Sequence, residues 1–131
     1  MNFVSTDRAA AAGGHYSQGV VHGGLVYVSG QLAIDPATGE KKPGTIEEQV
    51  ELALTNVVAI VEAAGGRVDT ILKTTAFLSD IELWPRLNET YARFFGDHRP
   101  ARAVVPVGEL PFGMTVEIEA VAAVAEATSS S

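Results

Sequence analysis

One segment of the chain carries an unbroken helical pattern, and it limits the possible folds more than any other feature. From about Ile46 to Ala64, apolar residues recur at helical spacing along one face: Ile46, Val50, Ala53, Leu54, Val57, Ile60, Val61 and Ala64. Thr45 and Glu48 have the spacing of a capping box, and Gly65-Gly66 forms a C-terminal stop. Because a helix with one apolar face must be covered, the rest of the chain has to supply a partner layer.

The segments around this helix are typical of strands. They are rich in β-branched and aromatic residues and are separated by turn residues. The predicted strands are 20–22, 25–31, 71–78, 101–107 and 115–124, with turns at Gly23-Gly24 and Asp35-Pro36-Ala37-Thr38-Gly39 and a loop containing Leu110-Pro111-Phe112-Gly113.

A second helix is expected after Asp80, which can cap it, and before Gly96, which ends it. Its apolar stripe consists of Trp84, Leu87, Tyr91, Phe94 and Phe95. This order of elements predicts an α+β fold with a single mixed β-sheet and both helices packed on one face. Since nothing in the chain remains to cover the other face, another subunit is the natural candidate. We expect one domain over residues 1–131, with about 125–131 as a flexible tail.

The last predicted strand has two different faces. By the period-two rule, Val116, Ile118, Ala120, Ala122 and Val124 share the face that matches the helix-covered core. Glu117 and Glu119 lie on the other face, between apolar residues. Two interpretations remain open for these acids. Either both point to water near the strand end, or the face is an interface with a polar cleft at its end.

Arg102 opens the preceding predicted strand, directly after Pro100 and on the same face as Val104. A guanidinium among apolar neighbours is costly to bury without an anion. In one hypothesis Arg102 forms a structural salt bridge with Glu117 or Glu119 on an adjacent strand. In the other, its fork binds the carboxylate of a ligand.

Two further polar residues have ordinary structural explanations when taken alone. Asn88 lies on the second helix, one turn from Trp84 and Tyr91, where an Asn usually bonds a nearby loop. Tyr16 lies in the polar segment Gly13–Gly19, where an isolated Tyr usually serves packing.

Composition excludes several classes of function. The net charge is −7 and the only basic pair is Lys41-Lys42, which disfavours a nucleic-acid partner. The chain has no cysteine, and its three histidines lie in different segments, so we expect no metal and no cofactor. The N-terminus lacks a signal peptide and no apolar run is long enough to cross a bilayer. We therefore expect a cytoplasmic protein with no membrane partner.

A set of short motifs, in a fixed order over about residues 8 to 124, resembles the RidA/YjgF family, also called the L-PSP family. Each motif is weak alone, and the ordered set is specific. The motifs are Tyr16-Ser17-Gln18-Gly19, Ser29-Gly30-Gln31, Asp35-Pro36 with Thr38-Gly39, Gln49, Asn56, Ala63-Ala64-Gly65, Lys73-Thr74-Thr75, Asn88-Glu89-Thr90-Tyr91, Phe94-Phe95, Pro100-Ala101-Arg102, Leu110-Pro111 and Val116-Glu117-Ile118-Glu119-Ala120.

The resemblance implies a chorismate-mutase-like fold, a homotrimer, and active sites in clefts between subunits. It implies hydrolysis of reactive 2-imino and enamine acids, such as 2-aminoacrylate, to 2-keto acids and ammonia. The family's arginine matches Arg102, expected to hold the substrate carboxylate, and its glutamate matches Glu117, expected to handle the attacking water. Positions that line the family's site match Tyr16, Gly30 and Asn88, and Val104 is expected to offer a backbone amide contact.

The sequence departs from the family at two positions. His15 stands where many members have Pro, and Val104 stands where many have Cys or Ser. Both changes bear on substrate preference and leave the arginine chemistry intact. Two alternative functions stay open: a non-catalytic, chaperone-like trimer that binds small carboxylates, and an endoribonuclease, which the acidic balance disfavours.

Overall fold

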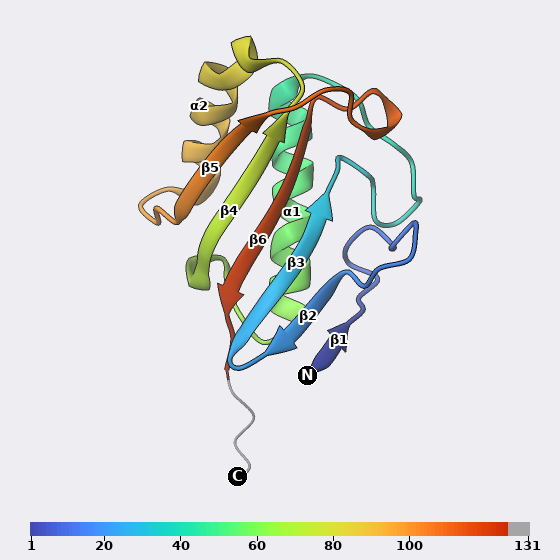
Figure 1. The fold of residues 1–131 in the computed structure, drawn as a ribbon, viewed down its shortest axis with the longest axis vertical. Coiled ribbons are helices and arrows are strands. Elements are labelled where there is room, and N and C mark those ends of the chain that lie inside the picture. The colour runs from blue at the N-terminus through green and yellow to red at the C-terminus, as the bar shows by residue number, and fades with distance from the viewer. Residues whose placement is uncertain (126–131) are drawn as a thin grey trace.

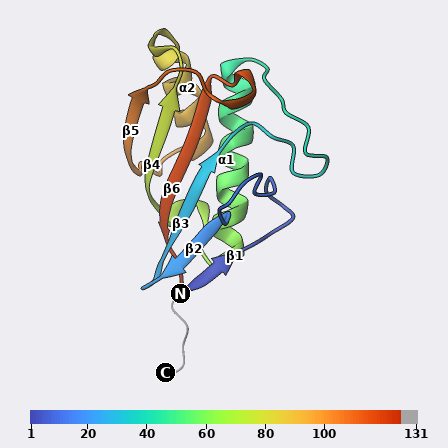
Figure 2. The same ribbon diagram turned by 45° about the vertical axis from the view of Figure 1, so that its right-hand side comes forward.

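A computed structural model describes residues 1–125 and places six strands in one sheet, in the order β1-β2-β3-β6-β4-β5. The strands are β1 (Asn2–Val4), β2 (Gly19–His22), β3 (Leu25–Gln31), β4 (Ile71–Leu78), β5 (Ala101–Pro106) and β6 (Val116–Ala123). Neighbours are antiparallel except β4 and β5, which are parallel. Both long helices lie on one face of the sheet (Figures 1 and 2). The α+β prediction is confirmed, and the predicted tail lies outside the described residues from position 126 on.

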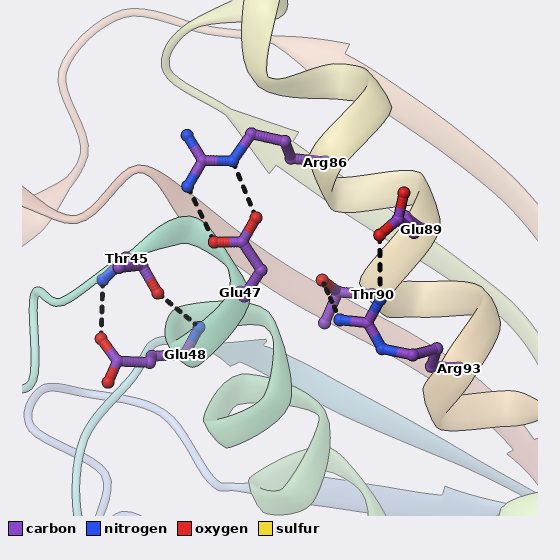
Figure 3. Close-up of polar contacts among 7 residues, drawn as sticks. All are labelled: Thr45, Glu47, Glu48, Arg86, Glu89, Thr90 and Arg93. Carbon is purple, nitrogen blue, oxygen red and sulfur yellow. Dashed lines mark hydrogen bonds and ion pairs between the residues drawn. The ribbon is translucent and has the colours of Figure 1, made fainter.

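The helix α1 (Ile46–Ala63) forms where its apolar pattern predicts it. The Thr45 hydroxyl accepts a hydrogen bond from the Glu48 amide, and the Glu48 carboxylate accepts one from the Thr45 amide (Figure 3). These bonds satisfy backbone donors that the first helical turn leaves free. At the other end the chain leaves the helix through Gly65, whose φ of 98° suits a glycine. The buried face of α1 then forms the centre of the core against β3 and β6.

The second helix begins later than expected. Asp80 caps the short 3₁₀ turn Ile81–Leu83, and α2 (Trp84–Phe95) follows that turn. Pro85 explains the boundary, because a proline lacks an amide proton and fits best in the first turn of a helix. Arg86 then joins α2 to α1 through two hydrogen bonds to the Glu47 carboxylate, of 2.7 and 2.8 Å (Figure 3). This ion pair lowers the pKa of Glu47 to about 2.

The N-terminal half of the sheet is a meander. The hairpin of β2 and β3 turns through Gly23 and Gly24, both at positive φ, as the tight turn between twisted strands requires. The strand β1 was not predicted, because its three residues are too short to show an alternating pattern. It adds an outer edge next to β2.

The two faces of the sheet differ in what covers them. On β6, the predicted core residues Val116, Ile118, Ala120 and Ala122 are buried under the helices, so that prediction is confirmed. The open face carries Glu117 and Glu119 together with apolar side chains that remain partly exposed, among them Tyr27, Phe77, Val105 and Val121. No helix of residues 1–125 is long and apolar enough to span a bilayer.

Candidate active site

The predicted site residues fall into two groups on different surfaces. Tyr16, Gly30 and Glu117 line one cavity of about 740 Å³ on the open face of the sheet, and Glu119 lines it too. Asn88, Arg102 and Val104 lie on α2 and on the outermost strand β5. The two residues expected to act on the substrate are therefore separated, with Glu117 at the cavity and Arg102 on β5.

A bulge in β3 creates the space in which the Glu117 carboxylate sits. The register between β3 and β6 shifts between Val28 and Gln31, which places Ser29 and Gly30 out of regular pairing. A methyl group added to Gly30 would lie 3.0 Å from the carboxyl carbon of Glu117 and nearer still to one of its oxygens. The missing side chain at residue 30 thus makes room for the carboxylate.

The Tyr16 segment is fastened to the same bulge. The Ser29 amide donates to the Gln18 carbonyl at 2.9 Å, and the Ser29 hydroxyl to the Ser17 carbonyl at 2.6 Å. The Tyr16 hydroxyl accepts a hydrogen bond from the Gly13 amide at 3.1 Å, and its ring is half exposed. Tyr16 therefore stands at the mouth of the cavity on a tethered loop.

The position of Glu117 changes its acidity. Burial raises the pKa of its carboxyl above the ordinary value, and the neighbouring charge of Glu119 raises it further. Both effects disfavour the ionised form. A carboxylate with a raised pKa is a better proton acceptor, which suits a general base that activates water near neutral pH.

Arg102 is held by aromatic rings rather than by an acid. Its guanidinium carbon lies 4.8 Å from the ring centre of Tyr91 and 5.6 Å from that of Trp84. In the register of the parallel strands β4 and β5, Arg102 lies opposite Thr74. The hydroxyl groups of Thr74 and Tyr91 form a hydrogen bond with each other. Asn88 lies between the two aromatic residues along the same side of α2. These contacts orient the cation without neutralising it.

No carboxylate of residues 1–125 forms an ion pair with Arg102, so the hypothesis of a structural salt bridge to Glu117 or Glu119 is wrong. The expectation of adjacent strands is wrong as well, because β4 lies between β5 and β6. The reason is the crossover through α2, which carries the chain from β4 to a parallel strand at the outer edge.

Arg102 and Glu117 also lie on opposite faces of the sheet. Arg102 is level with the buried Thr74 on the helix side, whereas Glu117 alternates with the buried Val116 and Ile118 and so points to the open side. Within a single chain the two side chains cannot contact the same small molecule.

Lys41 and Phe112 are among the residues of the cavity wall that sequence reasoning missed. Each comes from a loop, and no periodic pattern connects them. The sequence signal at Phe112 was an aromatic residue directly before a glycine in the predicted Leu110–Gly113 loop.

Gly30→Ala tests the fit between the bulge and Glu117. We expect kcat to fall by about 100-fold, because the new methyl group displaces the carboxylate and a misplacement of about 1 Å has an effect of that order. Steady-state kinetics on the 2-imino acids that the family resemblance leads us to expect as substrates measure this. Gly13→Ala is the matched control, since Gly13 lines the same cavity and an added methyl group meets nothing within 4 Å. Equal kcat in both variants would show that Glu117 needs no fixed position.

The family model described as "Endoribonuclease L-PSP" matches residues 6–124. The chain belongs to this family. This match confirms the resemblance to the RidA/YjgF (L-PSP) family that the sequence motifs indicate.

Its relatives are similar over almost their whole length. The 2-iminobutanoate/2-iminopropanoate deaminase of Escherichia coli is 44% identical over 122 residues, which are 91% of this chain and 94% of the relative. A crystal structure of a Thermotoga maritima protein has 48% identity and a TM-score of 0.90, covering 96% of this chain and 99% of that one. The structure of E. coli TdcF with bound serine has 41% identity and a TM-score of 0.89, covering 95% and 100%.

Proposed function

We propose that this L-PSP chain hydrolyses reactive 2-imino and enamine acids of the 2-aminoacrylate type to 2-keto acids and ammonia. The observation that carries the proposal is the half-buried Glu117 carboxylate, whose pKa is raised where it lines an accessible cavity. Relatives with more than two-fifths identity bear the name of such a deaminase. An imine carbon is electrophilic already, so positioned water and one general base are sufficient for hydrolysis.

We further propose that the site forms between neighbouring copies in a homotrimer. The open sheet face exposes apolar side chains, including Tyr27, Phe77 and Val105, which a second copy can bury. Contact between the open face of one copy and the β5 edge of the next brings Glu117 toward Arg102. This arrangement resolves the separation of the two residues within one chain.

The reaction follows from the roles of these two residues. Arg102 holds the substrate carboxylate in a forked pair and fixes C2 of the iminium group near Glu117. Water adds to C2: the C–O bond forms, one water proton passes to Glu117, and the electron pair of the C=N bond moves to nitrogen. Glu117 then protonates the amine, and the C–N bond breaks to release ammonia. The hydroxyl oxygen forms the keto C=O bond and loses its proton to solvent.

The remaining predicted residues surround this reaction centre. Tyr16 either binds the substrate carboxylate or closes the cleft, and Asn88 lies beside Arg102 on α2. Val104 contributes backbone groups from β5, which is an edge strand with one free side. These roles, the single domain and the cytoplasmic location stay predictions.

The proposal is tested by generating the imine in place. An amino-acid oxidase produces 2-iminopropanoate from alanine, and purified protein is expected to speed the release of pyruvate and ammonia above the uncatalysed rate. Light scattering after size-exclusion chromatography is expected to give three times the subunit mass. An unchanged release rate, or a monomer that is fully active, would contradict the proposal.

A binding function is the second candidate, and the bound serine in TdcF favours it. Calorimetry with pyruvate distinguishes the two: binding together with no rate increase on any imine would select a non-catalytic trimer that binds small carboxylates. An endoribonuclease activity agrees less well with a net charge of −7.

A further inference from the structure

Phe112 has a backbone conformation that a bulky residue rarely adopts. Its φ is 61° and its ψ is 24°, and it is the one non-glycine residue at positive φ among residues 1–125. Side chains other than Gly, Asn and Asp are disfavoured there by steric contact with the backbone. Backbone strain of this kind persists where the surrounding structure holds it, often beside a functional site. Here it projects an aromatic ring that is 58% exposed.

Lys41 reaches this ring from a different loop. Its ammonium nitrogen lies 4.8 Å from the Phe112 ring centre, within the range of a cation–π interaction. The backbone of Lys41 is fixed by a bridge to Ile34, and the Lys42 amide donates to the Ala33 carbonyl at 2.8 Å. Two separate loops thus hold the ring in place. We call Lys41 and Phe112 the rim pair.

The rim pair belongs to the Glu117 cavity. Leu32, Ile34, Pro111 and Phe112 give that cavity an apolar wall, while Glu117 and Glu119 give it an acidic side. The loop that carries Phe112 lies at the end of the sheet where β3 ends and β6 begins (Figure 1). The wall is therefore within the same hollow as the proposed general base.

The groups bonded to the reacting carbon determine which part of the substrate contacts the apolar wall of the cavity. The reacting carbon of a 2-imino acid carries three substituents: the carboxylate, the nitrogen and the side chain. Arg102 takes the carboxylate, and Glu117 serves the water and the departing nitrogen. The side chain is left to face the apolar wall, and a methyl group fills little of a cavity of about 740 Å³.

We propose that the rim pair makes this site selective for 2-imino acids with large apolar side chains, with the Phe112 ring as the residue that determines specificity. The inference rests on the proposed function and goes beyond it by naming the substrate class. Contact with the ring removes apolar substrate surface from water, and Lys41 keeps the ring in position for that contact.

The experiment compares imines made by an amino-acid oxidase from phenylalanine, leucine and alanine. The quantity measured is the ratio of kcat/KM for the phenylalanine-derived imine to that for the alanine-derived imine. Phe112→Asn removes the ring and keeps a residue that tolerates positive φ, so the loop is retained. We expect this ratio to fall by about 10-fold or more in Phe112→Asn, through a loss of kcat/KM for the phenylalanine-derived imine. Lys41→Met is expected to lower the same ratio by about 2- to 5-fold.

Phe3→Asn is the matched control, because Phe3 is also exposed but lines a different hollow beside β1. Its ratio is expected to equal that of the unchanged protein. If the ratio of kcat/KM values in Phe112→Asn equals that of the unchanged protein, the proposal is overturned. If no imine is turned over at all, the proposed function fails separately, and calorimetry still tests the rim pair. Phenylpyruvate is then expected to bind more tightly than pyruvate, and an advantage that survives Phe112→Asn would also overturn the proposal.

Discussion

Glu117→Gln is expected to lower kcat for imine hydrolysis by about 10²–10⁴-fold, which is the usual contribution of a general acid–base group. Gln has the same shape as Glu, so it fits the space left by Gly30 and should leave the fold unchanged. It cannot accept the proton from water. Initial rates of keto-acid release, corrected for the uncatalysed reaction, measure the effect. A kcat within about threefold of the original would remove Glu117 from the mechanism.

The pH profile gives a second measurement of the same residue. A general base works when it is ionised, so kcat/KM should decline as the pH falls through the raised pKa of Glu117, above the ordinary value of 4.5. Glu119→Gln removes the neighbouring negative charge, which contributes to that raised pKa. The decline should therefore move to lower pH in Glu119→Gln, while the activity on the plateau remains. An unchanged pH profile of kcat/KM in Glu119→Gln would show that a group other than Glu117 causes the decline.

Arg102→Ala is expected to lower kcat/KM by about 100-fold or more, since a forked pair of charged hydrogen bonds to the substrate carboxylate is lost. Arg102→Lys keeps the charge, but it loses the planar fork and its stacking on Tyr91 and Trp84. We expect its loss to be about 10-fold. Arg93→Ala is the control, because Arg93 bonds Glu89 and Thr90 on α2 (Figure 3) and should leave kcat/KM unchanged. Full activity of Arg102→Ala would exclude the carboxylate clamp.

Mixing the two inactive variants tests whether the site is shared between copies. If Arg102 of one copy works with Glu117 of the next, an equal mixture of Arg102→Ala and Glu117→Gln chains contains some interfaces with both residues intact. With random assembly, activity should return to about a quarter of the unmodified level. Separate denaturation and refolding of each variant is the control. No recovery in co-refolded mixtures would mean that each site belongs to one chain.

Regular patterns in the sequence were sufficient for most of the fold. The apolar stripe of α1 and the alternation along β6 reflect the helical and extended repeats of the backbone, so the buried faces follow from spacing alone. The strand β1 was missed because three residues carry no repeat. Asp80 was assigned to the wrong helical start because the 3₁₀ turn precedes Pro85.

The sequence could propose candidate site residues, but it could not predict how the fold arranges them. Arg102 and Glu117 could be singled out from their places on the predicted strands, but their separation depends on which strand lies between them. That order follows from the crossover through α2 and cannot be read from the spacing of two residues. The meeting of Lys41 and Phe112 likewise depends on two loops that only tertiary structure brings together.

The opposite placement of Arg102 and Glu117 has a consequence for how many working sites an assembly can have. In the proposed shared site, each copy offers one half-site that contains Arg102 and one that contains Glu117, so copies joined in an open row leave one half-site unused at each end. A row therefore always has fewer complete sites than members, and a pair joined through one such contact has a single site. Only a closed ring completes one shared site for every copy, so the shared site favours a closed assembly over an open row.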